Sequence, residues 1–267
     1  MLRIYIESIG LAAPGLPSWS ESQAVLRAEA PYSEFELEKY KPEQLPPNER
    51  RRATELVRMV FRVCEDMMNN SQIGMAECAS VFASSGGDYP IIDQICKALC
   101  EPERQVSPTQ FHNSVHNSAA GYWSIATESQ LPSTSISAYD DTFFAGLLEA
   151  ASLCCSENLP CILAIYDIKP PVPLNGKRKI DAEFGAAFLL SPQKKPHSLV
   201  EVTLERMASA NAINTPASTA ALEKLRLANP AARTLPLLEL IASGKPGTMT
   251  MLSANHVALQ IDVLPCN

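Results

Sequence analysis

Histidine and cysteine offer this chain the most chemistry, because they serve as nucleophiles, acid–base groups and metal ligands. The chain has four histidines and eight cysteines. His112 and His116 lie four residues apart, a spacing that puts both on one face of a helix. No HExxH pattern or suitably spaced acidic residue accompanies them, and the cysteines lack the paired short spacings of a zinc site. We therefore expect no metal and no cofactor, and we interpret the cysteines as small buried hydrophobes.

Charge and composition exclude several classes of protein. The 267 residues include 22 Lys and Arg against 29 Asp and Glu, a net charge of −7. An acidic chain is a poor binder of nucleic acid or of acidic lipid. A hydrophobic fraction of 46% is that of a packed globule. No apolar run is long enough to span a membrane and no signal-peptide pattern opens the chain, so we expect a cytoplasmic protein with reduced thiols.

Hydrophobic periodicity predicts alternating strands and helices. The expected strands are 3–9, 78–84, 133–138, 161–166, 184–190, 199–204, 248–253 and 256–263. The expected helices are 20–28, 49–69, 88–99, 113–127, 140–156, 219–228 and 235–242. Several strands are continuous apolar runs, which is typical of an α/β fold whose sheet is covered on both faces.

Two segments resemble the β-ketoacyl synthase family, which has the thiolase-like fold. They are 107–121 (SPTQFHNSVHNSAAG) and 135–146 (SISAYDDTFFAG). The apolar run 78–87, which ends in Ser-Ser-Gly-Gly, and the glycine-containing run 183–190 support the resemblance. The resemblance implies a complete N-terminal half over 1–205 and a reduced C-terminal half over 206–267, packed on the same domain.

The chain departs from the family where the family carries its nucleophile. In active synthases a cysteine follows the strand that ends in Ser-Ala or Thr-Ala, but here Ser137-Ala138 is followed by Tyr139. A phenol, with an ordinary pKa of about 10, cannot replace a thiolate as the acyl carrier. Asp140 and Asp141 follow and are expected to cap the next helix, but their charge would oppose a developing oxyanion. We therefore expect no catalytic residue here, and interpret Tyr139 as a plug of the former site or as a filler of a core gap.

Histidines give the second departure. Active synthases take two further catalytic groups, usually His, from glycine-containing segments of their C-terminal half. Neither His197 nor His256 lies in such a segment, and 253–256 (SANH) is only the nearest fragment. A synthase-like chain without its Cys and His resembles the chain-length factors, in the shortened form found beside synthases of aryl polyene clusters.

That resemblance implies a non-catalytic subunit. Chain-length factors form a heterodimer with an active β-ketoacyl synthase and shape the acyl or polyene tunnel in polyketide or fatty-acid-like elongation. An acyl carrier protein would be engaged indirectly, through the partner. On its own the chain is expected to show no acyltransferase activity.

The family also suggests which residues face the tunnel and the partner. The expected gate residues, on the helix after the Gly-Gly turn, are Asp88, Ile91, Ile92 and Ile95, although ordinary helix packing explains them equally well. The expected dimer-interface residues are Phe111, His112, Asn113, His116, Asn117, Tyr122 and Trp123. Aromatic residues are enriched in interfaces, but core packing is the alternative for them.

Two other functions stay open at this point. One is an active acyltransferase or synthase with a non-standard nucleophile, and the other is a homodimeric scaffold without an acyl tunnel. A basic run, 177–179 (KRK), is a further candidate contact for an acidic carrier protein.

Overall fold

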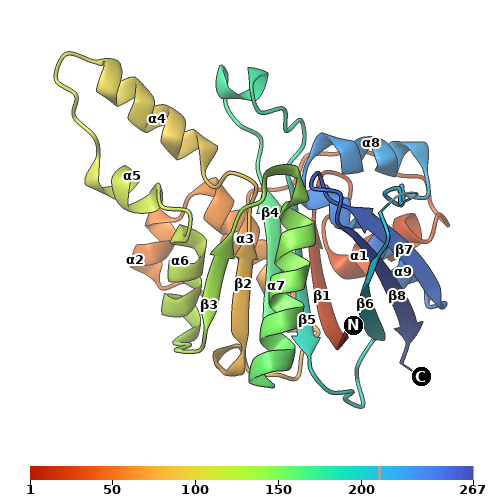
Figure 1. Ribbon diagram of the computed structural model, residues 1–267. Coiled ribbons are helices and arrows are strands. Elements are labelled where there is room, and N and C mark those ends of the chain that lie inside the picture. Colours follow the sequence, from red (N-terminus) through yellow and green to blue (C-terminus); the bar gives the residue numbers. More distant parts are fainter. Residues whose placement is uncertain (210–211, 267) are drawn as a thin grey trace.

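The computed structural model describes residues 1–209 and 212–266, and these residues form one mixed eight-stranded sheet (Figure 1). The strands run in the order β3-β2-β4-β5-β1-β6-β8-β7. Strand β2 pairs in parallel with β3 and β4, and the other neighbours are antiparallel. The bounds are β1 Leu2–Ala12, β2 Ala79–Ala83, β3 Ser133–Ile136, β4 Cys161–Asp167, β5 Phe184–Ser191, β6 Val200–Met207, β7 Gly247–Leu252 and β8 Ala258–Pro265.

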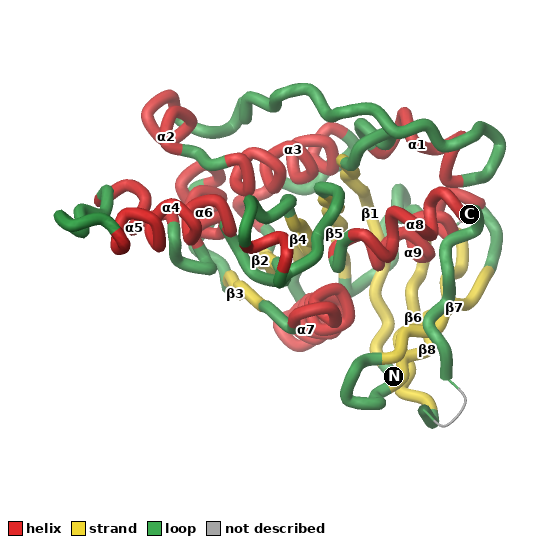
Figure 2. The backbone as a smooth tube through the Cα atoms, turned by 90° about the horizontal axis from the view of Figure 1, so that it is seen from above, coloured by secondary structure: helices red, strands yellow, loops and turns green. Residues whose placement is uncertain are grey.

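Helices cover both faces of the sheet, as the apolar strands predict. The bounds are α1 Trp19–Leu26, α2 Pro47–Arg52, α3 Glu55–Asn69, α4 Tyr89–Cys100, α5 Pro108–Asn113, α6 Ser118–Thr127, α7 Thr142–Glu157, α8 Ala220–Ala228 and α9 Leu235–Ser243. Figure 2 shows α3 and α7 on opposite sides of the strands. Successive strand residues alternate between the two cores: Val81 packs with α7 and Phe82 packs with α3 and α6.

Two predicted helices are each broken in two. The expected helix 49–69 is wrong because Ala53 is extended and the Thr54 side chain caps α3 by accepting a hydrogen bond from the Val57 amide. The expected helix 113–127 is also wrong, because α5 ends at Asn113 and α6 begins at Ser118. In both cases the apolar pattern continues across the break and does not reveal it.

The cysteine prediction is only partly right. Cys154 and Cys161 are buried, but Cys96 and Cys100 are exposed on α4. Helices α4 and α5 extend away from the sheet in both views, so part of α4 has no core to face (Figures 1 and 2). Across the described residues, no helix is both long enough and apolar enough to cross a membrane.

The two edges of the sheet differ. At the β7 edge, Asn214 and Thr215 bond to the backbone of Leu252 and Thr250, so side-chain and loop groups close this edge. Strand β3 pairs only with β2, and within the described chain no strand lies on its other side. An open edge carries unpaired backbone groups and can accept another strand.

The segment after residue 205 joins the same sheet. Strand β8 pairs with β6, and β7 pairs with β8. The assignment of 206–267 to a reduced C-terminal half stays a prediction.

Candidate functional site

The candidate site lies where the carboxyl ends of three parallel strands meet. Ser84 and Ser85 follow β2, Tyr139 follows β3, and Asp167 ends β4. The Ser137 hydroxyl donates to the Ser85 carbonyl at 2.9 Å, which links the turns after β2 and β3. In open α/β sheets this end of parallel strands is where ligands bind.

Tyr139 sits at the tip of a tight turn. Its φ of 53° is in the left-handed region, which costs a residue with a side chain about 1–2 kcal/mol. The Thr142 hydroxyl donates to the Tyr139 carbonyl at 2.7 Å and accepts from the Ala138 amide at 3.1 Å. The turn is thus fixed by its own backbone and by the first residue of α7.

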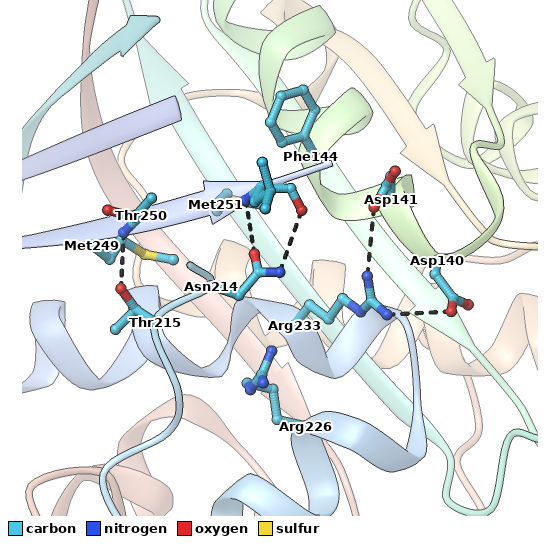
Figure 3. A pocket seen from close by; sticks show the side chains of 11 residues that line it. Asp140, Asp141, Phe144, Asn214, Thr215, Arg226, Arg233, Met249, Thr250 and Met251 are labelled. Atoms are coloured by element: carbon cyan, nitrogen blue, oxygen red, sulfur yellow. Dashed lines mark hydrogen bonds and ion pairs between the residues drawn. The ribbon is translucent and has the colours of Figure 1, made fainter. Parts of the chain in front are cut away.

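Asp140 and Asp141 do not cap the helix as expected. Neither the short 3₁₀ helix Tyr139–Asp141 nor α7 has a side-chain cap. Arg233 contacts both carboxylates, with its Nη2 at 3.3 Å from Asp140 Oδ2 and its Nη1 at 3.5 Å from Asp141 Oδ1 (Figure 3). Arg178 Nη1 lies 2.6 Å from Asp140 Oδ1, and the Ala254 amide donates to Asp141 Oδ2 at 2.7 Å. Ion pairing outcompetes capping because it neutralises two adjacent carboxylates.

Arg178 also stacks on Tyr139. Its guanidinium carbon lies 3.7 Å from the ring centroid, a cation–π contact. The Arg178 side chain is only 12% exposed, whereas Tyr139 is 60% exposed. Tyr139 therefore fills no core gap: it is mostly exposed and covers the largely buried side chain of Arg178. The sequence did not predict that Arg178 and Arg233 pair with the carboxylates at this turn. Its one indication was the basic run 177–179, which contains Arg178.

Asp167 is a buried carboxylate under the site, with 1% of the residue exposed. Its Oδ1 accepts from the Ser84 hydroxyl at 3.0 Å and from the amide and hydroxyl of Ser85 at 2.9 Å each. Its Oδ2 has no partner. Burial raises the pKa of Asp167 from 3.8 to about 6, and the three hydrogen bonds from the serines oppose that rise. Asp167 therefore holds the turn after β2 in place.

Two hollows border the turn. The smaller has a volume of about 10 Å³, room for about one water, and Arg233 and Phe144 are among the residues that line it (Figure 3). The larger, which we name the Tyr139 pocket, has a volume of about 300 Å³. Its polar lining consists of Tyr139, Asp140, Lys177, Arg178, Lys179, Asn229 and Arg233. No cysteine or histidine lines it, and the described residues contain no group of side chains able to hold a metal ion.

The expected gate residues lie on different sides of α4. Asp88 is buried and caps the helix, because its Oδ1 accepts from the Ile91 amide at 3.1 Å, and burial raises the pKa of its carboxyl. Ile91 is buried, Ile95 is half-buried and Ile92 is exposed. Ile91 and Ile95 thus share the inner face of α4, while Ile92 faces outward.

The expected interface residues divide into a buried and an exposed group. Asn113, Tyr122 and Trp123 are buried; the Tyr122 hydroxyl donates to Asn113 Oδ1 at 3.0 Å, and Trp123 packs against Phe61. These three belong to the core of this subunit, which corrects the expectation that they form a dimer surface. The half-buried His116 places Nε2 3.1 Å from the Ser84 carbonyl oxygen. The exposed group is Phe111, His112 and Asn117.

Comparisons with known proteins agree with this architecture. The model of the family described as beta-ketoacyl synthase, N-terminal domain, matches residues 18–256. A comparison with curated protein sequences finds no match. A solved structure of the ketosynthase ApeO in complex with its chain length factor ApeC from Xenorhabdus doucetiae matches with a TM-score of 0.72 and 23% identity, covering 98% of this chain and 100% of that chain.

Two further solved structures are similar over nearly their whole length. The ishigamide ketosynthase/chain length factor has a TM-score of 0.73 and 12% identity, with 100% of both chains covered. AntDE:AntF, a type II polyketide synthase acyl-carrier protein in complex with its ketosynthase, has a TM-score of 0.74 and 13% identity, with 99% of both chains covered. At these identities the likeness shows the fold, a thiolase-like ketosynthase fold, which confirms the predicted class.

Asp167 makes the stability of the protein depend on pH. The native carboxyl holds its proton up to about pH 6, whereas the unfolded carboxyl releases it near 3.8. The native state therefore binds more protons between these values, and this group lowers the free energy of unfolding as the pH rises through that window, by up to about 3 kcal/mol. In urea unfolding, the free energy of unfolding of the wild type should fall between about pH 4 and pH 6, and this fall should be absent in Asp167→Asn.

The matched control is Asp181→Asn, which removes an exposed carboxylate from the loop between β4 and β5. It should keep the pH dependence of the wild type. Identical pH profiles for wild type and Asp167→Asn would show that the buried carboxyl does not titrate in this window.

Proposed function

Because this chain belongs to the β-ketoacyl synthase family, by its N-terminal domain, we propose that it is a non-catalytic chain-length factor. It pairs with an active β-ketoacyl synthase and shapes the acyl tunnel during polyketide or aryl polyene elongation. One observation carries the proposal: the turn that follows β3 has a left-handed backbone at its tip and presents there Tyr139, stacked on Arg178.

The chemistry of the turn supports a role without acyl transfer. Acyl transfer requires an activated nucleophile and donors aimed at a developing oxyanion. Tyr139 offers a phenol, and the next two side chains are carboxylates already paired with Arg178 and Arg233. An oxyanion that developed at this turn would meet the carboxylates of Asp140 and Asp141 rather than free donors.

The open sheet edge supports pairing with another subunit. Strand β3 is unpaired on one side, and α6, which contacts β3, exposes Ile125. The segment before α6 exposes Phe111, at 68%, and Val115. An exposed edge flanked by apolar side chains is typical of an interaction surface. The ApeO and ApeC structure is named as a ketosynthase with its chain length factor.

An acyl carrier protein would then reach this chain through the partner. The net charge of −7 gives the chain little attraction for an acidic protein over most of its surface. Docking would depend on basic groups of the active subunit, and this chain would contribute tunnel wall and interface.

A thiol at the turn should not create a synthase. In Tyr139→Cys, two carboxylates remain beside the thiol and no imidazole lines the pocket, so we expect no condensing activity from the variant alone. Intact-mass spectrometry after incubation with an acyl thioester, with Tyr139→Ser as the matched variant, provides the measurement. A covalent acyl adduct on the wild-type chain would instead support an active acyltransferase with another nucleophile.

Pairing should depend on Phe111. On co-expression with a β-ketoacyl synthase that has its Cys and two His, wild type should co-purify one to one. Phe111→Asp puts a charge on the proposed interface and should cut the recovered complex by at least about tenfold, since a buried unpaired charge costs several kcal/mol.

Phe35→Asp is the matched control, because Phe35 is also an exposed phenylalanine but lies in the loop before α2. It should leave the complex intact. A wild-type chain that forms only homodimers on sizing would favour the scaffold alternative.

We also propose that α4 gates the tunnel through its half-buried Ile95. Ile95→Trp should fill space beside the acyl chain and shorten the products of the complex, as read by mass spectrometry. Leu264→Trp, an equivalent change at an exposed position of β8, should leave product length unchanged. Equal product lengths in both intact complexes would contradict the gate.

A further inference from the structure

The Tyr139 pocket has a charge opposite to that of the whole chain. Four cationic side chains line it, from Lys177, Arg178, Lys179 and Arg233, against the single carboxylate of Asp140. The chain carries a net charge of −7, so this concentration of positive charge is a local feature. A concave wall lined by one sign of charge strengthens the local potential and attracts ions of the opposite sign.

The only carboxylate in the lining is already neutralised. Asp140 Oδ1 lies 2.6 Å from Arg178 Nη1, and Oδ2 lies 3.3 Å from Arg233 Nη2. Lys177 and Lys179 are exposed, and neither forms an ion pair with any described residue. Two ammonium groups therefore remain to receive an incoming anion at this pocket.

The rest of the lining is suited to an organic group. Leu227 of α8 lines the pocket and is 67% exposed, and the Tyr139 ring, which stacks on Arg178, is also mostly exposed. Gly176 lines the pocket without a side chain. A volume of about 300 Å³ exceeds that of a bare ion and is at the lower end for small-ligand sites.

From these features we propose that the Tyr139 pocket binds a small phosphate monoester. The phosphate lies between Lys177 and Lys179, which offer rotatable donors to a dianion with three acceptor oxygens. Its organic part lies against Tyr139 and Leu227. A carboxylate matches this pocket less well, because a single negative charge leaves one ammonium group unpaired. The proposal is independent of pairing with a synthase.

The direct test is isothermal titration of the full chain with inorganic phosphate and with phenyl phosphate. Both should bind saturably at one site, the ester more tightly, and added NaCl should weaken both. Lys177→Ala/Lys179→Ala should weaken binding by about tenfold. Lys194→Ala/Lys195→Ala removes the same charge from another exposed pair and should leave binding unchanged.

A second pair of variants adds charge instead of removing it. A Cβ added at Gly176 or at Gly121 meets no heavy atom within 4 Å, so both positions accept a side chain without a clash. Gly176→Glu puts a carboxylate in the pocket and should abolish binding of both probes. Gly121→Glu makes the same charge change on α6 and should not. Leu227→Ala should remove the advantage of phenyl phosphate over inorganic phosphate.

Four outcomes would overturn the proposal, the last of them by refuting the ester. The first is no saturable binding of either probe in the millimolar range. The second is equal weakening in Lys177→Ala/Lys179→Ala and Lys194→Ala/Lys195→Ala, which would mean a general charge effect. In the third, phosphate does not bind, but an acidic carrier protein binds the wild type more tightly than Lys177→Ala/Lys179→Ala. That result would assign the two lysines to a protein-binding surface. Equal affinity for both probes, unaffected by Leu227→Ala, would limit the site to free phosphate and refute the ester.

Discussion

The structure around the candidate site depends on the neutralisation of two adjacent carboxylates. Asp140 and Asp141 follow each other at the start of α7, where their charges repel unless cations compensate them. Arg178 comes from the loop after β4, and Arg233 comes from the 3₁₀ helix Ala231–Thr234 before α9. Asp141 also accepts from the amide of Ala254, between β7 and β8. One pair of carboxylates therefore joins three segments that are distant in sequence to the turn after β3.

This arrangement explains how the turn keeps its geometry whatever side chain stands at its tip. The left-handed Tyr139 is held by the Thr142 hydroxyl and by the hydrogen bond of Ser137 to the Ser85 carbonyl, none of which needs a nucleophile. Strand pairing fixes where β3 ends, and α7 must start there to cover the sheet. The geometry of the turn is thus a requirement of the fold, and the side chain at its tip is free to change.

The sequence predicted the α/β class and most of the elements, because apolar periodicity records which face of each element is buried. The assignment of Tyr139 to the position of the family's nucleophile, from the Ser-Ala that precedes it, stays a prediction. The sequence did not predict the breaks at Thr54 and after Asn113, because the apolar pattern continues across both. It could not predict the partners of Asp140, because ion pairs between residues 38 or more positions apart have no periodic signal. It also could not predict that Tyr122 is buried in the core, because an aromatic residue fits a core or an interface equally well.

The two edges of the sheet show how pairing and tunnel shape would be connected. Native proteins usually cover the edge strands of a sheet or place charged side chains on them. Here Asn214 and Thr215 close the β7 edge by hydrogen bonds to its backbone. The β3 edge is open, and Tyr139 is three residues beyond its last residue, Ile136, at most about 10 Å of chain away. A subunit that pairs at β3 would therefore lie close to the Tyr139 turn. Under the proposed pairing, any change in how that subunit sits on β3 would also change the surroundings of the Tyr139 turn, so one surface would determine both the partner and the shape of the site.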